Sequence, residues 1–147
     1  MRESAISETF RHFDKLDIVI VGIGAIVPEV RSMLIGSGCV PGAELKSLKQ
    51  AGAVGDVFSY FINDKGEIVQ TEIYERSITI GIRQIRKIPT TVGVATGAEK
   101  SRAVAAAIRG GFINTLIVDS LLAEALLGHY APHPRRRDQT REHANSW

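Results

Sequence analysis

A lysine follows a strand and a tight loop in the later part of the chain. Thr90–Ala95 is an apolar, β-branched run after Pro89, the composition of a buried strand. Thr96 and Gly97 interrupt the run, and either is suited to cap a helix whose first turn holds Lys100. A helix start presents free N–H groups and a positive dipole end, so with Lys100 it favours an anion. The alternative is a loop that binds nothing, with the lysine solvated.

The predicted helix leads into a second strand. Its apolar residues recur at helical spacing as far as Ile108, and the glycines at 110–111 supply a stop. Thr115–Asp119 is again apolar and β-branched, and Asp119 is placed to cap a further helix that ends at Gly128. These elements predict a β-α-β unit.

An aspartate stands in an unusual place for a charge. Asp56 lies between Gly55 and an apolar strand expected over Phe58–Ile62. Its carboxylate either caps neighbouring backbone N–H groups or contacts a ligand. Asn63–Gly66 has turn composition and Glu67–Val69 resumes extended chain, which predicts a hairpin-like region.

A glycine pair ends an earlier strand. Asp17–Val21 is continuously apolar and β-branched, which predicts a strand buried on both faces of a parallel sheet. Gly22 and Gly24 would let the backbone turn sharply at the strand's carboxyl edge, where open α/β sheets place ligands. The third glycine of a dinucleotide fingerprint and the acidic residue beyond a second strand are both missing, which excludes a nicotinamide cofactor site.

The remaining pattern predicts an α/β domain. Helices are expected at Glu3–Phe13, Pro28–Ile35 and Pro41–Ala51, whereas Thr71–Ile82 fits either alternating strand or helical turn. The order of elements indicates a Rossmann-like, mainly parallel sheet with flanking helices and one hairpin-like insertion, incomplete at its N-terminal side.

Composition limits the possible functions. The chain has 147 residues with a net charge of +2, too mild to indicate nucleic-acid binding. Cys39 is the lone cysteine and excludes an internal disulfide, and no apolar run approaches a membrane span. A cytoplasmic protein without metal or other cofactor is expected. Residues 129–147 hold two prolines, an arginine run and histidines without metal-ligand spacing, which predicts a mobile tail.

Three segments together resemble a known family. They are DIVIVGIGAI (Asp17–Ile26), AGAVGDVFSYFINDKGEIV (Ala51–Val69) and the stretch from IPTTVGVATGAEK to DSLLAEALL (Ile88–Leu127). Their order and spacing resemble the later half of the sugar-binding (effector) domain of SorC/DeoR-type bacterial transcriptional regulators. Thr96, where the family often has glycine, and Ser120, where it more often has an acidic residue, depart from the pattern.

The resemblance implies a fold like that of the glucosamine-phosphate isomerase, ribose-phosphate isomerase and CoA-transferase group, and a phosphorylated sugar as effector. By matching position, Lys100 would meet a phosphate and Asp56 a sugar hydroxyl or a phosphate oxygen. The loops with Gly22 and Gly24 and with Thr96 and Gly97 would form the pocket floor.

The resemblance also sets the expected domain organisation. Residues 1–128 would be the later half of the effector domain, with the helix-turn-helix part and a Gly/Ser/Thr-rich phosphate loop absent from this chain. DNA contact would come only through that absent domain, and full effector affinity would need the absent half. Family regulators work as oligomers, so a homo-oligomer is expected.

Three functions compete. The favoured one is a non-enzymatic effector-binding module of a transcriptional regulator. The second is a sugar-phosphate isomerase-like enzyme, which would need a base and a ring-opening acid; Asp56 is a candidate base, but His12, on a predicted helix, is the only histidine before the tail. The third is a truncated oligomerisation remnant without ligand.

Overall fold

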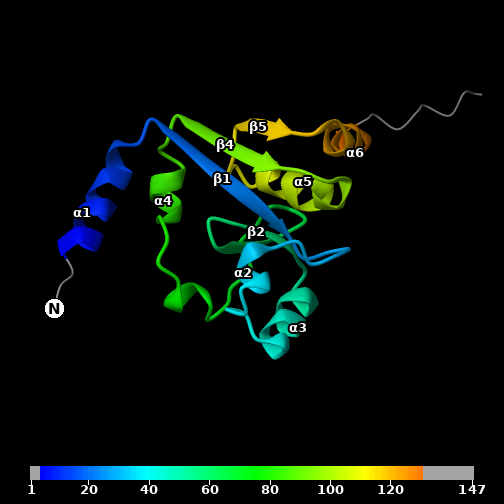
Figure 1. Ribbon diagram of the computed structural model, residues 1–147, viewed down its shortest axis with the longest axis horizontal. Coiled ribbons are helices and arrows are strands. Elements are labelled where there is room, and N and C mark those ends of the chain that lie inside the picture. The colour runs from blue at the N-terminus through cyan, green and yellow to red at the C-terminus, as the bar shows by residue number, and fades with distance from the viewer. Residues whose placement is uncertain (1–3, 131–147) are drawn as a thin grey trace, which may run out of the picture.

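The computed structural model describes residues 4–130, which form six α-helices and a five-stranded sheet (Figure 1). The strands are β1 (Ile18–Ala25), β2 (Ala53–Val57), β3 (Tyr60–Asn63), β4 (Thr90–Ala95) and β5 (Thr115–Val118). The helices are α1 (Ser4–His12), α2 (Met33–Gly36), α3 (Gly42–Gln50), α4 (Ile82–Ile85), α5 (Ser101–Arg109) and α6 (Ser120–Tyr130). Single 3-10 turns occur at η1 (Phe13–Lys15), η2 (Tyr74–Arg76) and η3 (Ala98–Lys100).

The sheet has the order β3-β2-β1-β4-β5. Strands β1, β4 and β5 run parallel, whereas β2 pairs antiparallel with both β1 and β3. The parallel strands are linked through α5 and other crossover segments, as parallel pairing requires. This confirms the predicted α/β architecture, a largely parallel sheet with an antiparallel hairpin at one side.

Helix α5 forms the centre of the core. Five consecutive residues, Ala103–Ala107, are completely shielded from solvent. The helix contacts β1, β2, β3 and α6, so it is enclosed on most sides. A side chain at Gly55 would overlap the Cβ of Ala103, so small residues set the distance between the helix and β2. Phe112 and Leu122 complete this cluster.

Strand β1 is buried on one face only in its first half. Val19 and Val21 pack against the core around α5. Ile18 and Ile20 point the other way, with 60% and 69% of their surface exposed. The prediction of burial on both faces is therefore wrong for the described residues, because no element among residues 4–130 covers this side.

The segment around the glycine pair also differs from the prediction. Gly22 and Gly24 lie inside β1, which continues to Ala25, and they make no sharp turn. The helix expected over Pro28–Ile35 does not form; only the single turn α2 follows. The chain folds back instead, with the Arg31 N–H donating to the Ala25 carbonyl at 2.8 Å, so backbone pairing to β1 replaces the first helical turn.

Further differences concern turns and ends. The hairpin between β2 and β3 turns at Phe58 and Ser59, which were expected within a strand; the predicted turn at Asn63–Gly66 is present as well. The ambiguous segment Thr71–Ile82 forms η2 and the start of α4. Helix α6 continues through Gly128, so the predicted end of the helix at this glycine is wrong. Beyond Tyr130, the predicted tail with Arg135–Arg137 lies outside the described residues.

Asn114 joins the starts of β4 and β5. Its Nδ2 donates to the Pro89 carbonyl at 2.8 Å and its Oδ1 accepts from the Thr91 N–H at 3.0 Å. Asn114→Ala would leave the N–H of buried Thr91 without this partner. We expect a loss of about 1–3 kcal/mol in the free energy of unfolding by urea. Asn114→Asp keeps the acceptor and should lose less; an equal loss in both variants would contradict this role.

Candidate functional site

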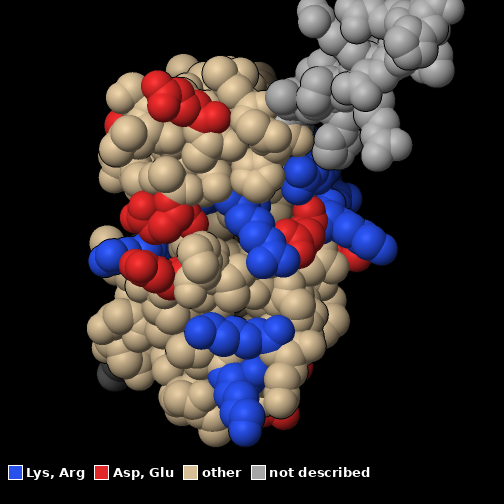
Figure 2. All heavy atoms as spheres, turned by 90° about the vertical axis from the view of Figure 1, so that its right-hand side faces the viewer, with Lys and Arg blue, Asp and Glu red and all other residues tan. Residues whose placement is uncertain are grey.

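A cavity of about 560 Å³ opens at the carboxyl ends of β1 and β2. It is lined by the end of β1, the segment after it, the β2–β3 turn and η3. Figure 2 shows the side toward which the arrowheads of β1 and β4 point in Figure 1, where acidic and basic side chains lie together across the middle. Three charged residues line the cavity: Arg31, Asp56 and Lys100.

Lys100 reaches from the loop after β4 toward the end of β1. It lies in η3, directly before α5, and its Nζ donates to the Ile23 carbonyl at 3.0 Å. This carbonyl belongs to the neighbouring parallel strand, so the ammonium group is held at the sheet's carboxyl edge and is half-buried. The prediction placed Lys100 in the first turn of the long helix; it actually ends the 3-10 turn that precedes it.

Asp56 contributes a buried carboxylate oxygen. Its Oδ1 is shielded from solvent and has no hydrogen-bond partner among residues 4–130. Asp56 lies opposite Gly24 in the β1–β2 pairing, and a side chain at Gly24 would overlap that Oδ1. The glycine therefore makes room for the carboxylate, and backbone capping does not account for this oxygen.

The electrostatic environment of Asp56 is mixed. Burial raises the pKa of its carboxyl group above the ordinary value, while a hydrogen bond from the Ser32 side chain and the charge of Lys100 oppose the rise. Burial is the largest effect. A partly buried carboxylate that lines a cavity together with two cations is placed to interact with a polar ligand.

Arg31 is a second cation that the sequence prediction missed. Its backbone is fixed by the bridge to Ala25, and its side chain forms ion pairs with Glu29 at 2.9 Å and with Glu99 at 3.8 Å. About half of the side chain is exposed, so it remains accessible to a ligand. The expectation of a helix over this stretch concealed its position, because only the fold-back brings Arg31 to the cavity.

The turn at Phe58 and Ser59 was also missed. Both residues line the cavity and both adopt the left-handed backbone region, with φ of 53° and 63°. Residues other than glycine, asparagine or aspartate rarely adopt this backbone conformation. Each such residue lowers the free energy of unfolding by about 1–2 kcal/mol. The usual signal of such a hairpin is Asn-Gly or Asp-Gly, which is absent here.

The structure brings together four of the six predicted site residues. Gly22, Gly24, Asp56 and Lys100 line the cavity. Thr96 and Gly97 lie outside its lining, because the Gly97 N–H donates to the Asp119 carboxylate at 3.0 Å, which ties their loop toward α6. Gly97 is the N-cap residue of η3, which leads into α5, so the prediction that Thr96 or Gly97 begins the helix is confirmed for Gly97 and not for Thr96.

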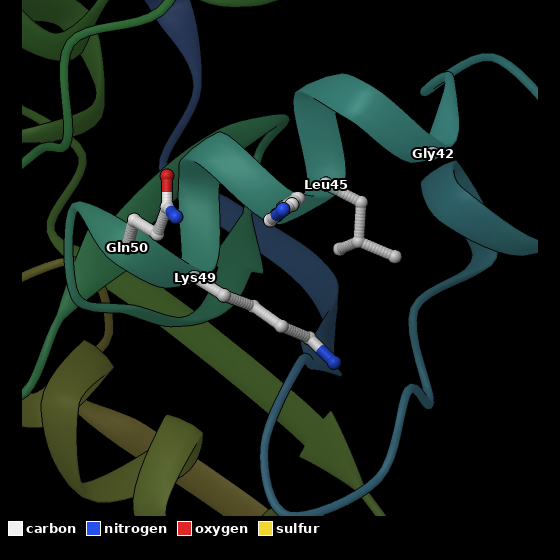
Figure 3. A pocket seen from close by; sticks show the side chains of 5 residues that line it. Gly42, Leu45, Lys49 and Gln50 are labelled. Atoms are coloured by element: carbon white, nitrogen blue, oxygen red, sulfur yellow. The ribbon is translucent and has the colours of Figure 1, made fainter.

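A second hollow lies along α3 (Figure 3). It measures about 460 Å³ and its lining includes Leu45, Lys49 and Gln50, whose side chains extend from one side of the helix. All three come from a single surface helix, and the hollow holds no buried polar group, so we do not regard it as the site.

The described part of the chain contains neither a group of metal-ligand side chains nor a helix that could span a membrane. Among residues 4–130, no three His, Cys, Asp or Glu side chains are grouped to hold a metal ion. Every helix in that range falls short of the length and apolarity of a membrane span.

This chain is similar to parts of known transcriptional regulators. Residues 1–128 match the family model described as "Putative sugar-binding domain". The transcriptional regulator LsrR of Escherichia coli K12 is 36% identical over 126 residues, which cover 85% of this chain and 40% of LsrR. The full-length sorbitol operon regulator SorC from Klebsiella pneumoniae superposes with a TM-score of 0.74 at 27% identity, covering 86% of this chain and 41% of SorC. The sugar-binding domain of a transcriptional repressor from Vibrio fischeri gives 0.73 at 27% identity, covering 88% of this chain and 51% of that one.

The chain belongs to the sugar-binding domain family of SorC/DeoR-type transcriptional regulators. This confirms the resemblance drawn from the three sequence segments. This chain spans about 40% of the length of the curated regulators that it matches.

When it is charged, the buried carboxylate of Asp56 should lower the free energy of unfolding of this chain. The folded-state pKa of Asp56 lies above its ordinary value of 3.8, so the native state binds the proton more tightly than the unfolded state. The free energy of unfolding therefore falls as the pH rises from the ordinary pKa through the raised one, and then levels off.

D56N removes the charge at nearly constant shape. We expect it to be more stable by about 1 kcal/mol at pH 7 and to lose the part of the pH dependence that Asp56 causes. Urea unfolding from pH 4 to pH 8 measures both. A D56N variant that is less stable than wild type at pH 7 would contradict the prediction.

Proposed function

We propose that the cavity binds a phosphorylated sugar, and that this chain is the non-enzymatic effector-binding part of a transcriptional regulator. The observation that carries the proposal is the largely buried carboxylate of Asp56 in the lining of the same cavity as the ammonium group of Lys100. A carboxylate oxygen is the acceptor that a sugar hydroxyl needs, and an ammonium group suits a phosphate. Family membership supports sugar as the ligand class.

In this proposal the charged residues contact different parts of the ligand. Lys100 meets the phosphate, with Arg31 as a second cation that exchanges its pairing with Glu99 for the ligand. Asp56 accepts from a hydroxyl, and Gly22 and Gly24 form the floor. Thr96 and Gly97 would contact the ligand only if their loop moves toward the cavity.

The residues that line the cavity favour a regulatory function over a catalytic one. An isomerase needs an acid and a base at the substrate. Among the described residues, Asp56 is the one carboxyl group of the lining, and no histidine accompanies it. We further propose a cytoplasmic homo-oligomer whose DNA contact lies outside residues 1–128.

The proposed phosphate contact can be tested at Lys100. Thermal unfolding of the 147-residue chain is followed with a panel of sugar phosphates and the corresponding neutral sugars. One phosphosugar should raise the melting temperature by about 5–10 °C at 100 times its Kd. Lys100→Ala should weaken its binding about 10- to 100-fold, and Lys49→Ala, in the hollow along α3, serves as the control. Equal binding by Lys100→Ala would overturn this role, and turnover of the sugar would overturn the non-enzymatic one.

Arg31 gives a separate test of charge recognition. Arg31→Gln should weaken the phosphosugar about tenfold and leave any neutral sugar unaffected, because it removes a cation without changing the hydroxyl contacts. Isothermal titration calorimetry with both ligands measures the difference. Arg76→Gln is the matched control. It breaks an ion pair with Glu44, and neither residue is part of the cavity lining. Parallel losses for both ligands would argue against a phosphate contact at Arg31.

A further inference from the structure

One face of the parallel strands is apolar and open. Ile20 is paired in register with Val92, and Gly22 with Val94, while Val94 is paired with Ile117 of β5. Side chains in register on parallel strands point to the same face, and residues two apart along a strand share it. The open sheet face is therefore made of residues from all three parallel strands: Ile18, Ile20, Gly22, Thr90, Val92, Val94, Thr115 and Ile117.

Most of this face is uncovered by residues 4–130, although Val92 at its centre exposes only 8% of its surface. Ile18, Ile20 and Ile117 expose 60%, 69% and 58% of their surface, and a Cβ added at Gly22 would meet nothing within 4 Å. The opposite face carries Val19 and Val21, which pack against the core. In Figure 1, β1 and β4 cross in front of α5, and no helix lies on the viewer's side of them.

The composition of the open sheet face is that of an interior. Parallel sheets are covered on both faces in folded proteins, and their strands are apolar on both. Six of the eight residues of this face are isoleucine, valine or glycine, the other two are threonines, and none carries a charge. A contiguous apolar surface of this kind on a protein indicates an interaction site. Its partner must offer an apolar surface as well.

The lengths of the relatives indicate what that partner is. The solved chain from Vibrio fischeri is a sugar-binding domain, yet the match covers only 51% of it. The match to SorC covers 41%. About half of such a domain therefore consists of chain that has no counterpart among these residues, while this half leaves one face of its sheet bare.

We propose that the open sheet face docks the complementary half of a SorC-type sugar-binding domain, the half outside the match, whether that half is joined to this chain or is a separate polypeptide. The complementary half supplies an apolar layer that packs on Ile18, Ile20 and Ile117 and so covers the second face of the sheet. The proposal rests on family membership and the exposed face, and it is independent of which ligand the cavity takes.

Co-expression tests the proposal directly. The tagged 147-residue chain is produced together with an untagged polypeptide carrying the unmatched half of the Vibrio fischeri domain. We expect the two to copurify, and light scattering to give the mass of a one-to-one complex. Hydrogen exchange should slow in β1 and β5 within the complex. Each buried isoleucine contributes on the order of a 10- to 100-fold change in Kd, so Ile20→Asp and Ile117→Asp should each abolish copurification.

Ile78→Asp is the matched control, because Ile78 is 77% exposed and lies between η2 and α4, outside the open sheet face. Circular dichroism verifies that all three variants stay folded. Failure to copurify, or copurification that Ile20→Asp and Ile117→Asp leave intact, would overturn the proposal. A homodimer that these two variants dissociate would instead identify a second copy as the occupant and overturn it as well. None of these outcomes depends on the sugar-phosphate titration, so the two proposals can fail separately.

Discussion

The close packing of α5 against the sheet is the constraint on which the rest of the structure depends. Five buried alanine-sized or slightly larger residues in a row let the helix lie near β2, where Gly55 offers no side chain against Ala103. Toward the C-terminal end of the helix, Gly66 and Gly110 approach each other so closely that neither could carry a Cβ without displacing the other's backbone. Interiors are packed to crystal-like density, so each of these small residues sets a distance.

The position of the site follows from that packing. Because α5 is fixed on the sheet, the 3-10 turn before it is held at the carboxyl edge, and Lys100 can reach the Ile23 carbonyl. Asp119 secures the same loop from the other side, accepting from the Gly97 N–H at 3.0 Å and from the Leu122 N–H at 2.8 Å. One carboxylate thus ties the loop before α5 to the first turn of α6. The cavity is built from loops, but rigid elements determine where those loops lie.

The sequence was most informative where local chemistry decides the structure. Pro89 and the β-branched run after it predicted β4 at its observed bounds, and Asp119 caps α6 as expected. Asp56 was identified because a charge beside an apolar strand is unusual, and Lys100 because it stands at a predicted helix start after a strand and a tight loop. Arg31 could not be identified, since it reaches the cavity through a backbone bridge to Ala25 that no local pattern encodes. Phe58 and Ser59 lack the residue types that signal a tight hairpin, and only the pairing of β2 with β3 imposes their conformation.

The error about β1 has a different cause. Its unbroken apolar run was interpreted as burial on both faces, and that interpretation describes the residue types correctly: Ile18 and Ile20 are as apolar as Val19 and Val21. What differs is the surroundings, because residues 4–130 cover only one side of the strand. The residue types on a strand match the surroundings in which the strand is buried, and those surroundings can come from a polypeptide segment outside residues 4–130. An exposed pair of isoleucines on a parallel strand is therefore better understood as half of an interface than as a tolerated irregularity.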